Sequence, residues 1–99
     1  MDGLDIRLEK DEQRWVLRLE GTLDGRTASA VSEALRELPP VPLTLDFSRV
    51  RTFVDLSVDA LTQALRDRPV SLTGLGRHQA RMFRYFGLRI DEREQSAEA

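Results

Sequence analysis

Residues 4–20, LDIRLEKDEQRWVLRLE, decide the class of fold, because apolar and polar side chains alternate along most of their length. Leu4, Ile6 and Leu8 are apolar, and the residues between them are charged. After a short polar link the alternation resumes at Trp15. A period of two on both sides of a polar link predicts an antiparallel β-hairpin that buries one face.

The sequence after the hairpin alternates between helical and strand patterns. Asp24 is a residue type that favours a helix N-cap, and Pro39 and Pro40 end the helix that it begins. Further apolar residues at spacings of three and four predict two more helices. The predicted helices cover residues 25–38, 55–67 and 77–86, the predicted strands cover 41–47 and 70–73, and Leu88 and Ile90 predict one more short strand.

The strand pattern also predicts how the elements are layered. Parallel strands that are covered on both faces read as continuous apolar runs, whereas each strand predicted here alternates. One face of the sheet is therefore expected to be solvated, with the helices mainly on the other face. The prediction is a two-layer α/β domain with a mixed sheet in the order β-β-α-β-α-β-α-(β). It covers residues 1–90, and the composition of the acidic tail, 91–99, permits either a short helix or disorder.

Composition excludes several classes of function. The chain of 99 residues has no cysteine and one histidine, His78, which excludes disulfides, thiolate metal sites and multi-histidine metal sites, so that no metal or cofactor is expected. Residues 91–99 carry four acids and one arginine, so residues 1–90 have a net charge of +1 within the total of −2. This balance disfavours a nucleic-acid partner. Without a long apolar run or a signal peptide, we expect a cytoplasmic protein that does not insert into a membrane.

Three motifs, in this order, resemble those of the STAS domain family. They are GTLD at 21–24, LTLDFSRVRTFVDLS at 43–57, and the stretch from Leu72-Thr73-Gly74-Leu75 to Phe86-Gly87-Leu88. The resemblance covers about residues 4–90. It implies a mixed sheet flanked by helices and, for bacterial members, an adaptor that has no catalytic activity and that binds other proteins.

The same resemblance places Ser57 at the position that a partner kinase phosphorylates in this family. A phosphate in the first turn of a helix lies near free backbone N–H groups and the positive end of the helix dipole. This sequence departs from the family pattern, because Val58 replaces a glycine, Leu56 replaces a small residue and Asp59 adds a like charge. The alternative interpretation is that Asp55 and Ser57 serve only as a helix cap and a first-turn residue.

The partner-binding surface is expected in a loop at 48–57 and at the start of the second helix. Its most exposed residues are expected to be Ser48, Arg49, Arg51, Asp55 and Ser57. The first hypothesis is an adaptor similar to an anti-sigma factor antagonist. It would bind an anti-sigma factor or serine kinase and would release it when Ser57 is phosphorylated.

Two other functions remain open. The resemblance is also consistent with a structural STAS subunit of a lipid-transport ABC system, whose partner is the ATPase, and the missing glycine after Ser57 mildly favours such a non-switching role. A small hydrolase would need Asp55, Ser57 and His78 to act together. Side chains two residues apart on a helix do not face each other, which disfavours that arrangement. The sequence leaves the oligomeric state open.

Overall fold

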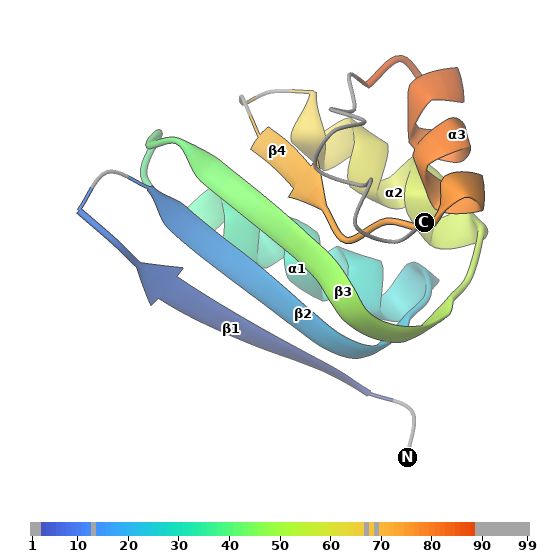
Figure 1. Ribbon diagram of the computed structural model, residues 1–99, viewed down its shortest axis with the longest axis horizontal. Helices are drawn as coiled ribbons and strands as arrows, with labels where there is room; N and C mark the ends of the chain where they lie inside the picture. Colours follow the sequence, from blue (N-terminus) through green and yellow to red (C-terminus); the bar gives the residue numbers. More distant parts are fainter. Residues whose placement is uncertain (1–2, 13, 67, 69, 89–99) are drawn as a thin grey trace.

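The alternating N-terminal stretch forms the first two strands of a four-stranded sheet, shown in a computed structural model that describes residues 3–12, 14–66, 68 and 70–88 (Figure 1). The elements are β1 (Leu4–Lys10), β2 (Trp15–Leu23), α1 (Gly25–Glu37), β3 (Leu43–Phe53), α2 (Leu56–Leu65), β4 (Val70–Thr73) and α3 (Arg77–Tyr85).

The sheet is mixed, with the strands in the order β1-β2-β3-β4. β1 and β2 pair antiparallel, with Leu8 opposite Leu17, whereas β2 with β3 and β3 with β4 pair parallel. Since parallel neighbours need a crossover connection, α1 joins β2 to β3 and α2 joins β3 to β4. The helices cover one face of the sheet and leave the other open (Figure 1). The predicted fold class and the order of the first seven elements are confirmed.

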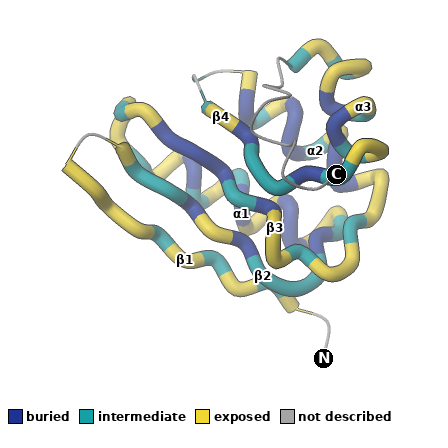
Figure 2. The backbone as a smooth tube through the Cα atoms, viewed as in Figure 1, coloured by how far each residue is buried: buried dark blue, intermediate teal, exposed yellow. Residues whose placement is uncertain are grey.

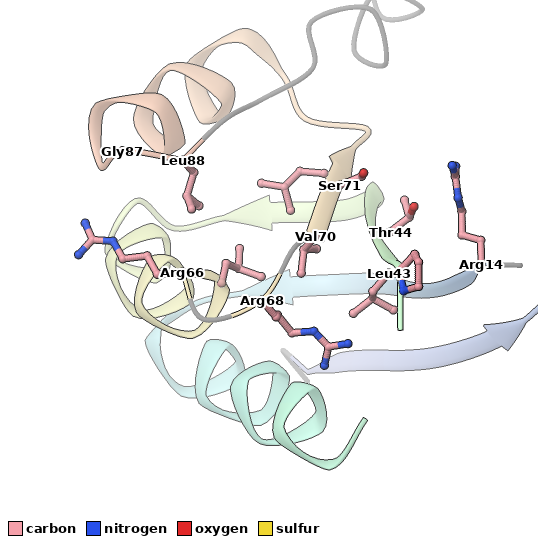
Figure 3. Close-up of a pocket in the computed structure, with 12 residues that line it drawn as sticks. Arg14, Leu43, Thr44, Arg66, Arg68, Val70, Ser71, Gly87 and Leu88 are labelled. Atoms are coloured by element: carbon pink, nitrogen blue, oxygen red, sulfur yellow. The ribbon is translucent and has the colours of Figure 1, made fainter. Parts of the chain in front are cut away.

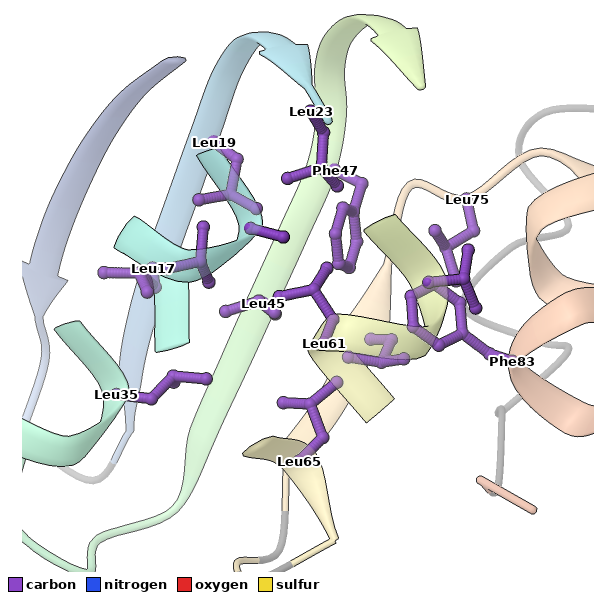
Figure 4. Packing of buried hydrophobic residues seen from close by; sticks show 14 of the residues in the cluster. Leu17, Leu19, Leu23, Leu35, Leu45, Phe47, Leu61, Leu65, Leu75 and Phe83 are labelled. Atoms are coloured by element: carbon purple, nitrogen blue, oxygen red, sulfur yellow. The ribbon is translucent and has the colours of Figure 1, made fainter. Parts of the chain in front are cut away.

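The hydrophobic core lies between the sheet and the helices (Figures 2 and 4). Alternate residues of β2 and β3 point into it, and each helix contributes one apolar stripe, as the periodicity predicts. Three phenylalanine rings from β3 and α3 meet with their centroids 5.8–6.3 Å apart. The core includes Leu17, Leu19, Leu45, Phe47, Val31, Leu35, Leu61, Leu65, Leu72 and Phe83.

The third strand corrects the prediction of a loop at 48–57. β3 continues to Phe53, because β2 continues to Leu23 and pairs with β3 in parallel along the whole length of both strands. Two register shifts in this pairing, one of them next to Gly21, accommodate the extra residues. The predicted binding loop is therefore mostly strand, and the connection from β3 to α2 is reduced to Val54 and Asp55.

The short strand predicted at Leu88 and Ile90 falls partly outside the described residues. Leu88 lies in no regular element. Ile90 and the tail 91–99 lie outside the described residues. No helix in the described part of the chain is long and apolar enough to cross a membrane.

Arg68 holds the C-terminal end of α1 and the connection to β3. Its guanidinium donates hydrogen bonds to the carbonyl oxygens of Leu35 at 2.9 Å and Pro39 at 2.8 Å, and to those of Leu38 and Val41 at 3.4 and 3.2 Å. These carbonyls include acceptors that the end of a helix leaves without partners. The Nε of the same side chain is buried without a hydrogen-bond partner. The four hydrogen bonds from the other two nitrogens offset the free-energy cost of burying Nε without a partner.

The start of α1 is fixed by a reciprocal pair. The backbone N–H of Thr27 donates to the carboxylate of Asp24 at 2.9 Å, and the backbone N–H of Asp24 donates to the hydroxyl of Thr27 at 2.8 Å. This is a capping box, which confirms Asp24 as the N-cap. The Thr27 hydroxyl also donates to the carbonyl of Thr22 at 2.9 Å, so the helix start is tied to the end of β2.

We expect Arg68→Ala to lower the free energy of unfolding by about 2–4 kcal/mol, because four backbone carbonyls lose a charged donor. Arg68→Lys should recover only part of this loss, since one ammonium cannot reach four acceptors in the geometry of a guanidinium. Urea denaturation of the three proteins measures both effects. Equal stability of wild type and Arg68→Ala contradicts the role assigned to this side chain.

We also expect the cap at Asp24 to make stability depend on pH. The hydrogen bond from the Thr27 N–H lowers the pKa of Asp24 below its ordinary value. Its stabilisation is therefore complete at neutral pH and is lost as the pH falls from about 4 through the folded-state pKa. Asp24→Asn keeps a good N-cap but does not titrate. Wild type should lose stability relative to Asp24→Asn between pH 7 and about pH 3 in urea denaturation, and a constant difference contradicts the prediction.

Candidate functional site

The residues singled out from the sequence lie along β3 and at the start of α2. β3 and β4 are parallel, so α2 and α3, which follow them, both begin at the same end of the sheet. This arrangement brings His78, in the first turn of α3, next to Asp55, which immediately precedes α2. We call the exposed residues at this end, Val54, Asp55, Leu56 and His78, the α2-start surface.

Asp55 and His78 form the polar part of this surface. The Nε2 atom of His78 lies 3.1 and 3.2 Å from the two carboxylate oxygens of Asp55. More than half of each side chain is exposed to solvent. Asp55 occupies the N-cap position of α2, but its side chain makes no capping hydrogen bond. The interpretation of Asp55 as a helix cap is therefore correct for the position of the residue. It is wrong for the side chain, which contacts His78 and does not cap the helix.

Ser57 is not exposed, contrary to expectation. Its exposed fraction is 0%. The hydroxyl donates a hydrogen bond of 2.6 Å to the carbonyl oxygen of Val54, which also accepts from the Ser57 backbone N–H at 2.9 Å. The first turn of α2 therefore presents Ser57 and Val58 to the protein interior. Since its hydrogen bond goes to Val54, the hydroxyl forms no triad with Asp55 and His78.

The apolar side chain that the first turn exposes is Leu56, which lies within the predicted surface but was not among the residues expected to be most exposed. Its exposed fraction is 78%, and that of the neighbouring Val54 is 36%. Together with Tyr85 they are the exposed large apolar residues of the described chain. One feature of the sequence could have indicated that Leu56 belongs among the candidate binding residues. A leucine stands at this position, where the family pattern has a small residue.

Ser48, Arg49 and Arg51 are exposed as predicted, but they lie on β3 rather than in a loop. Nη1 of Arg49 is 3.9 Å from the carboxylate of Glu20 on β2. Ser48 lies against Gly74, which has a φ of +76°, and a Cβ atom at Gly74 would come within 2.5 Å of the Ser48 nitrogen. Only glycine fits this turn between β4 and α3.

The open face of the sheet carries a charged cluster next to Ser48. Arg18 on β2 forms ion pairs with Glu9 on β1, at 2.9 Å, and with Asp46 on β3. Burial alone would raise the pKa of Asp46, but hydrogen bonds from Ser48 and Arg18 outweigh it and leave that pKa below its ordinary value. The cluster links three strands and fixes the backbone at Ser48, whose N–H donates to Asp46 at 2.9 Å.

A groove of about 580 Å³ lies at the other end of the parallel strands, beside Leu43 and Val70 (Figure 3). Arg14, Arg66 and Arg68 line it. Arg68 is bound to the carbonyls at the end of α1, and Arg66 donates to the Phe86 carbonyl at 2.8 Å, so two of the three guanidinium groups are engaged by backbone. The described residues contain no group of three or more side chains that could hold a metal ion.

Solved structures share this fold. An anti-sigma factor antagonist from Mycobacterium paratuberculosis has a TM-score of 0.68 and 20% identity, with 87% of this chain and 80% of that chain covered. The anti-sigma factor antagonist SpoIIAA in its unphosphorylated form has a TM-score of 0.63 and 18% identity, with 88% and 87% covered. A protein described as Mglu has a TM-score of 0.65 and 23% identity, but the 72% of this chain that matches corresponds to 20% of that one.

Sequence comparison places the chain in a family. None of the curated proteins matches it. The family model described as "Mlab, STAS domain" matches residues 6–90, which include both parallel strand pairs and all three helices. The motifs at 21–24 and 43–57 thus occur in the structural context that the resemblance implies, and the chain belongs to the STAS domain family.

Proposed function

We propose that this chain is a non-enzymatic adaptor that binds a protein partner through the α2-start surface. The observation that carries the proposal is the exposure of Leu56, a large apolar side chain with an exposed fraction of 78% at the start of a helix. An apolar centre with a polar rim is the usual anatomy of a protein interface. Val54 extends the apolar centre, while Asp55 and His78 supply hydrogen-bonding groups beside it.

The partner in this proposal is an anti-sigma factor of the serine-kinase type. The family membership and the fold shared with proteins described as anti-sigma factor antagonists support this class of partner. Arg49 and Arg51, exposed on β3, add positive charge to the contact, and Ser48 adds a hydroxyl. Ser57 contributes from inside, because its bonds to Val54 hold the turn that presents Leu56.

The buried position of Ser57 favours a second candidate, in which the partner is held constitutively. A kinase needs access to the hydroxyl, and access requires the first turn of α2 to open and the bond to Val54 to break. A structural subunit that supports the ATPase of a lipid-transport ABC system needs no such opening. The two candidates share the α2-start surface and differ in the partner and in the modification of Ser57.

We expect Leu56→Asp to weaken partner binding at least about tenfold, because a carboxylate replaces the apolar centre of the contact. Isothermal titration calorimetry measures this with two purified probes from the source organism, a serine-kinase anti-sigma factor and an ABC-transporter ATPase. The probe that binds wild type identifies which candidate is correct.

Tyr85→Asp is the matched control. Tyr85 is also a large exposed side chain, at 86%, but it lies at the last residue of α3, about 12 Å along the helix from its start. It should bind as wild type does. Loss of binding in both variants, or in neither, contradicts the assignment of the α2-start surface, and failure of both probes to bind wild type contradicts the proposed function.

We further expect Ser57→Asp to lower the free energy of unfolding by about 3 kcal/mol or more, because it buries a charge without a partner. Ser57→Ala should cost only about 1 kcal/mol for one hydrogen bond. Urea denaturation tests both values. In parallel, the serine kinase and ATP are incubated with folded wild type and followed by mass spectrometry. Complete phosphorylation of Ser57 in the folded protein contradicts the constitutive candidate.

A further inference from the structure

β1 forms one edge of the sheet, and no described element lies beyond it (Figure 1). The Gly3 carbonyl accepts from the Thr22 N–H at 3.0 Å, so these two residues form a hydrogen-bonded pair of the antiparallel ladder. Because such pairs alternate along the strand, the odd-numbered residues of β1 bond to β2. The N–H and C=O groups of Leu4, Ile6 and Leu8 therefore point to the open edge, where another strand can pair with them.

The charges on β1 are poorly matched to β2. Asp5 lies directly opposite Glu20, and Arg7 lies directly opposite Arg18. Like charges in directly opposed positions destabilise a strand pair. Glu20 is near Arg49, and Arg18 is paired with other acids, but no ion pair joins Asp5 or Arg7 to another described residue.

We propose that this chain forms a two-fold symmetric homodimer in which the β1 strands of two copies pair antiparallel about Ile6. In this register Ile6 lies opposite Ile6 of the second copy, and Leu4 lies opposite its Leu8. Asp5 of each copy then lies opposite Arg7 of the other. The two charged side chains that have no ion pair within the described residues thus become each other's partners, twice by symmetry.

The charges distinguish between registers that the backbone groups allow. Pairing about Ile6 matches even-numbered residues with even-numbered residues, so three opposed pairs can form about six backbone hydrogen bonds. Pairing about Arg7 instead satisfies the backbone, but it opposes Arg7 to itself and Asp5 to Glu9. Pairing about Asp5 opposes that residue to itself. The register about Arg7, which would pair the whole of β1, opposes like charges, as a strand edge protected against association does, whereas the register about Ile6 opposes complementary charges.

The apolar side of β1 also gains cover in this arrangement. Leu4, Ile6 and Leu8 lie on the helix side of the sheet and are only half-buried (Figure 2). No helix lies over β1 as α1 and α2 lie over the rest of the sheet (Figure 1). Cross-strand contacts of these three side chains with those of the second copy would bury the exposed half. The two sheets would become one continuous sheet, which leaves the α2-start surface of each copy free.

Sedimentation velocity of the full chain from about 1 µM to about 1 mM tests the dimer. Wild type should associate reversibly to a dimer and no further. Arg7→Asp leaves acids opposite acids, and Asp5→Arg leaves bases opposite bases. Each variant alone should dimerise at least about tenfold more weakly than wild type, because two attractive pairs become repulsive. An equimolar mixture should form a heterodimer, since acids then face bases in each opposed pair.

These variants are suited to the test because each removes a like-charge pair within the monomer, opposite Arg18 or Glu20. Loss of the dimer therefore cannot be attributed to unfolding, and circular dichroism verifies this. Arg81→Asp, on an exposed position of α3, controls for the change in net charge of Arg7→Asp and should dimerise as wild type does.

Three results would overturn the proposal. A wild-type monomer at all concentrations excludes the dimer. A dimer that Arg7→Asp and Asp5→Arg leave intact, or that their mixture fails to restore, places the interface elsewhere. Growth beyond the dimer indicates that β1 pairs with the β4 edge of another copy, because such a head-to-tail contact does not close.

Discussion

The parallel pairing of β2 with β3 continues to Leu23 and Phe53, and the position of every residue at the start of α2 depends on it. Beyond the last pair, the Val54 N–H donates to the Leu23 carbonyl at 2.9 Å, so the connection to α2 is still held by β2. The Val54 carbonyl then accepts both hydrogen bonds from Ser57. One backbone unit therefore ties the sheet to the helix and determines that Ser57 points inward and Leu56 outward.

The architecture could be predicted from the sequence because its signals are local. Alternation over 4–20, the apolar stripes of the helices and the prolines at 39 and 40 each act within one element. The end of β3 could not be predicted in the same way. In residues 48–53 apolar and polar side chains do not alternate regularly. These residues form a strand only because β2 is long enough to pair with them through two register shifts.

The candidate site shows the same division between local and tertiary effects. The residue types at 55–57 indicated a helix start, which the structure has at Leu56. Which side chain of the first turn faces the core depends on the position of the sheet relative to α2. The residues of the turn do not by themselves indicate that position. The pairing of Asp55 with His78, 23 residues apart in the sequence, likewise depends on β3 and β4 being parallel neighbours, which places the starts of α2 and α3 side by side.

Arg68 has a consequence for how the molecule loses its structure. In the sequence it lies between α2 and β4, yet its hydrogen bonds reach carbonyls from Leu35 to Val41, at the end of α1 and in the connection to β3. α1 packs against α2 as well as against the sheet. Fraying at the end of α1 therefore breaks the hydrogen bonds of Arg68, and movement of Arg68 leaves the same carbonyls without their donor. We therefore expect Arg68 and the end of α1 to open together, so that the backbone amides around them would have similar protection against hydrogen exchange.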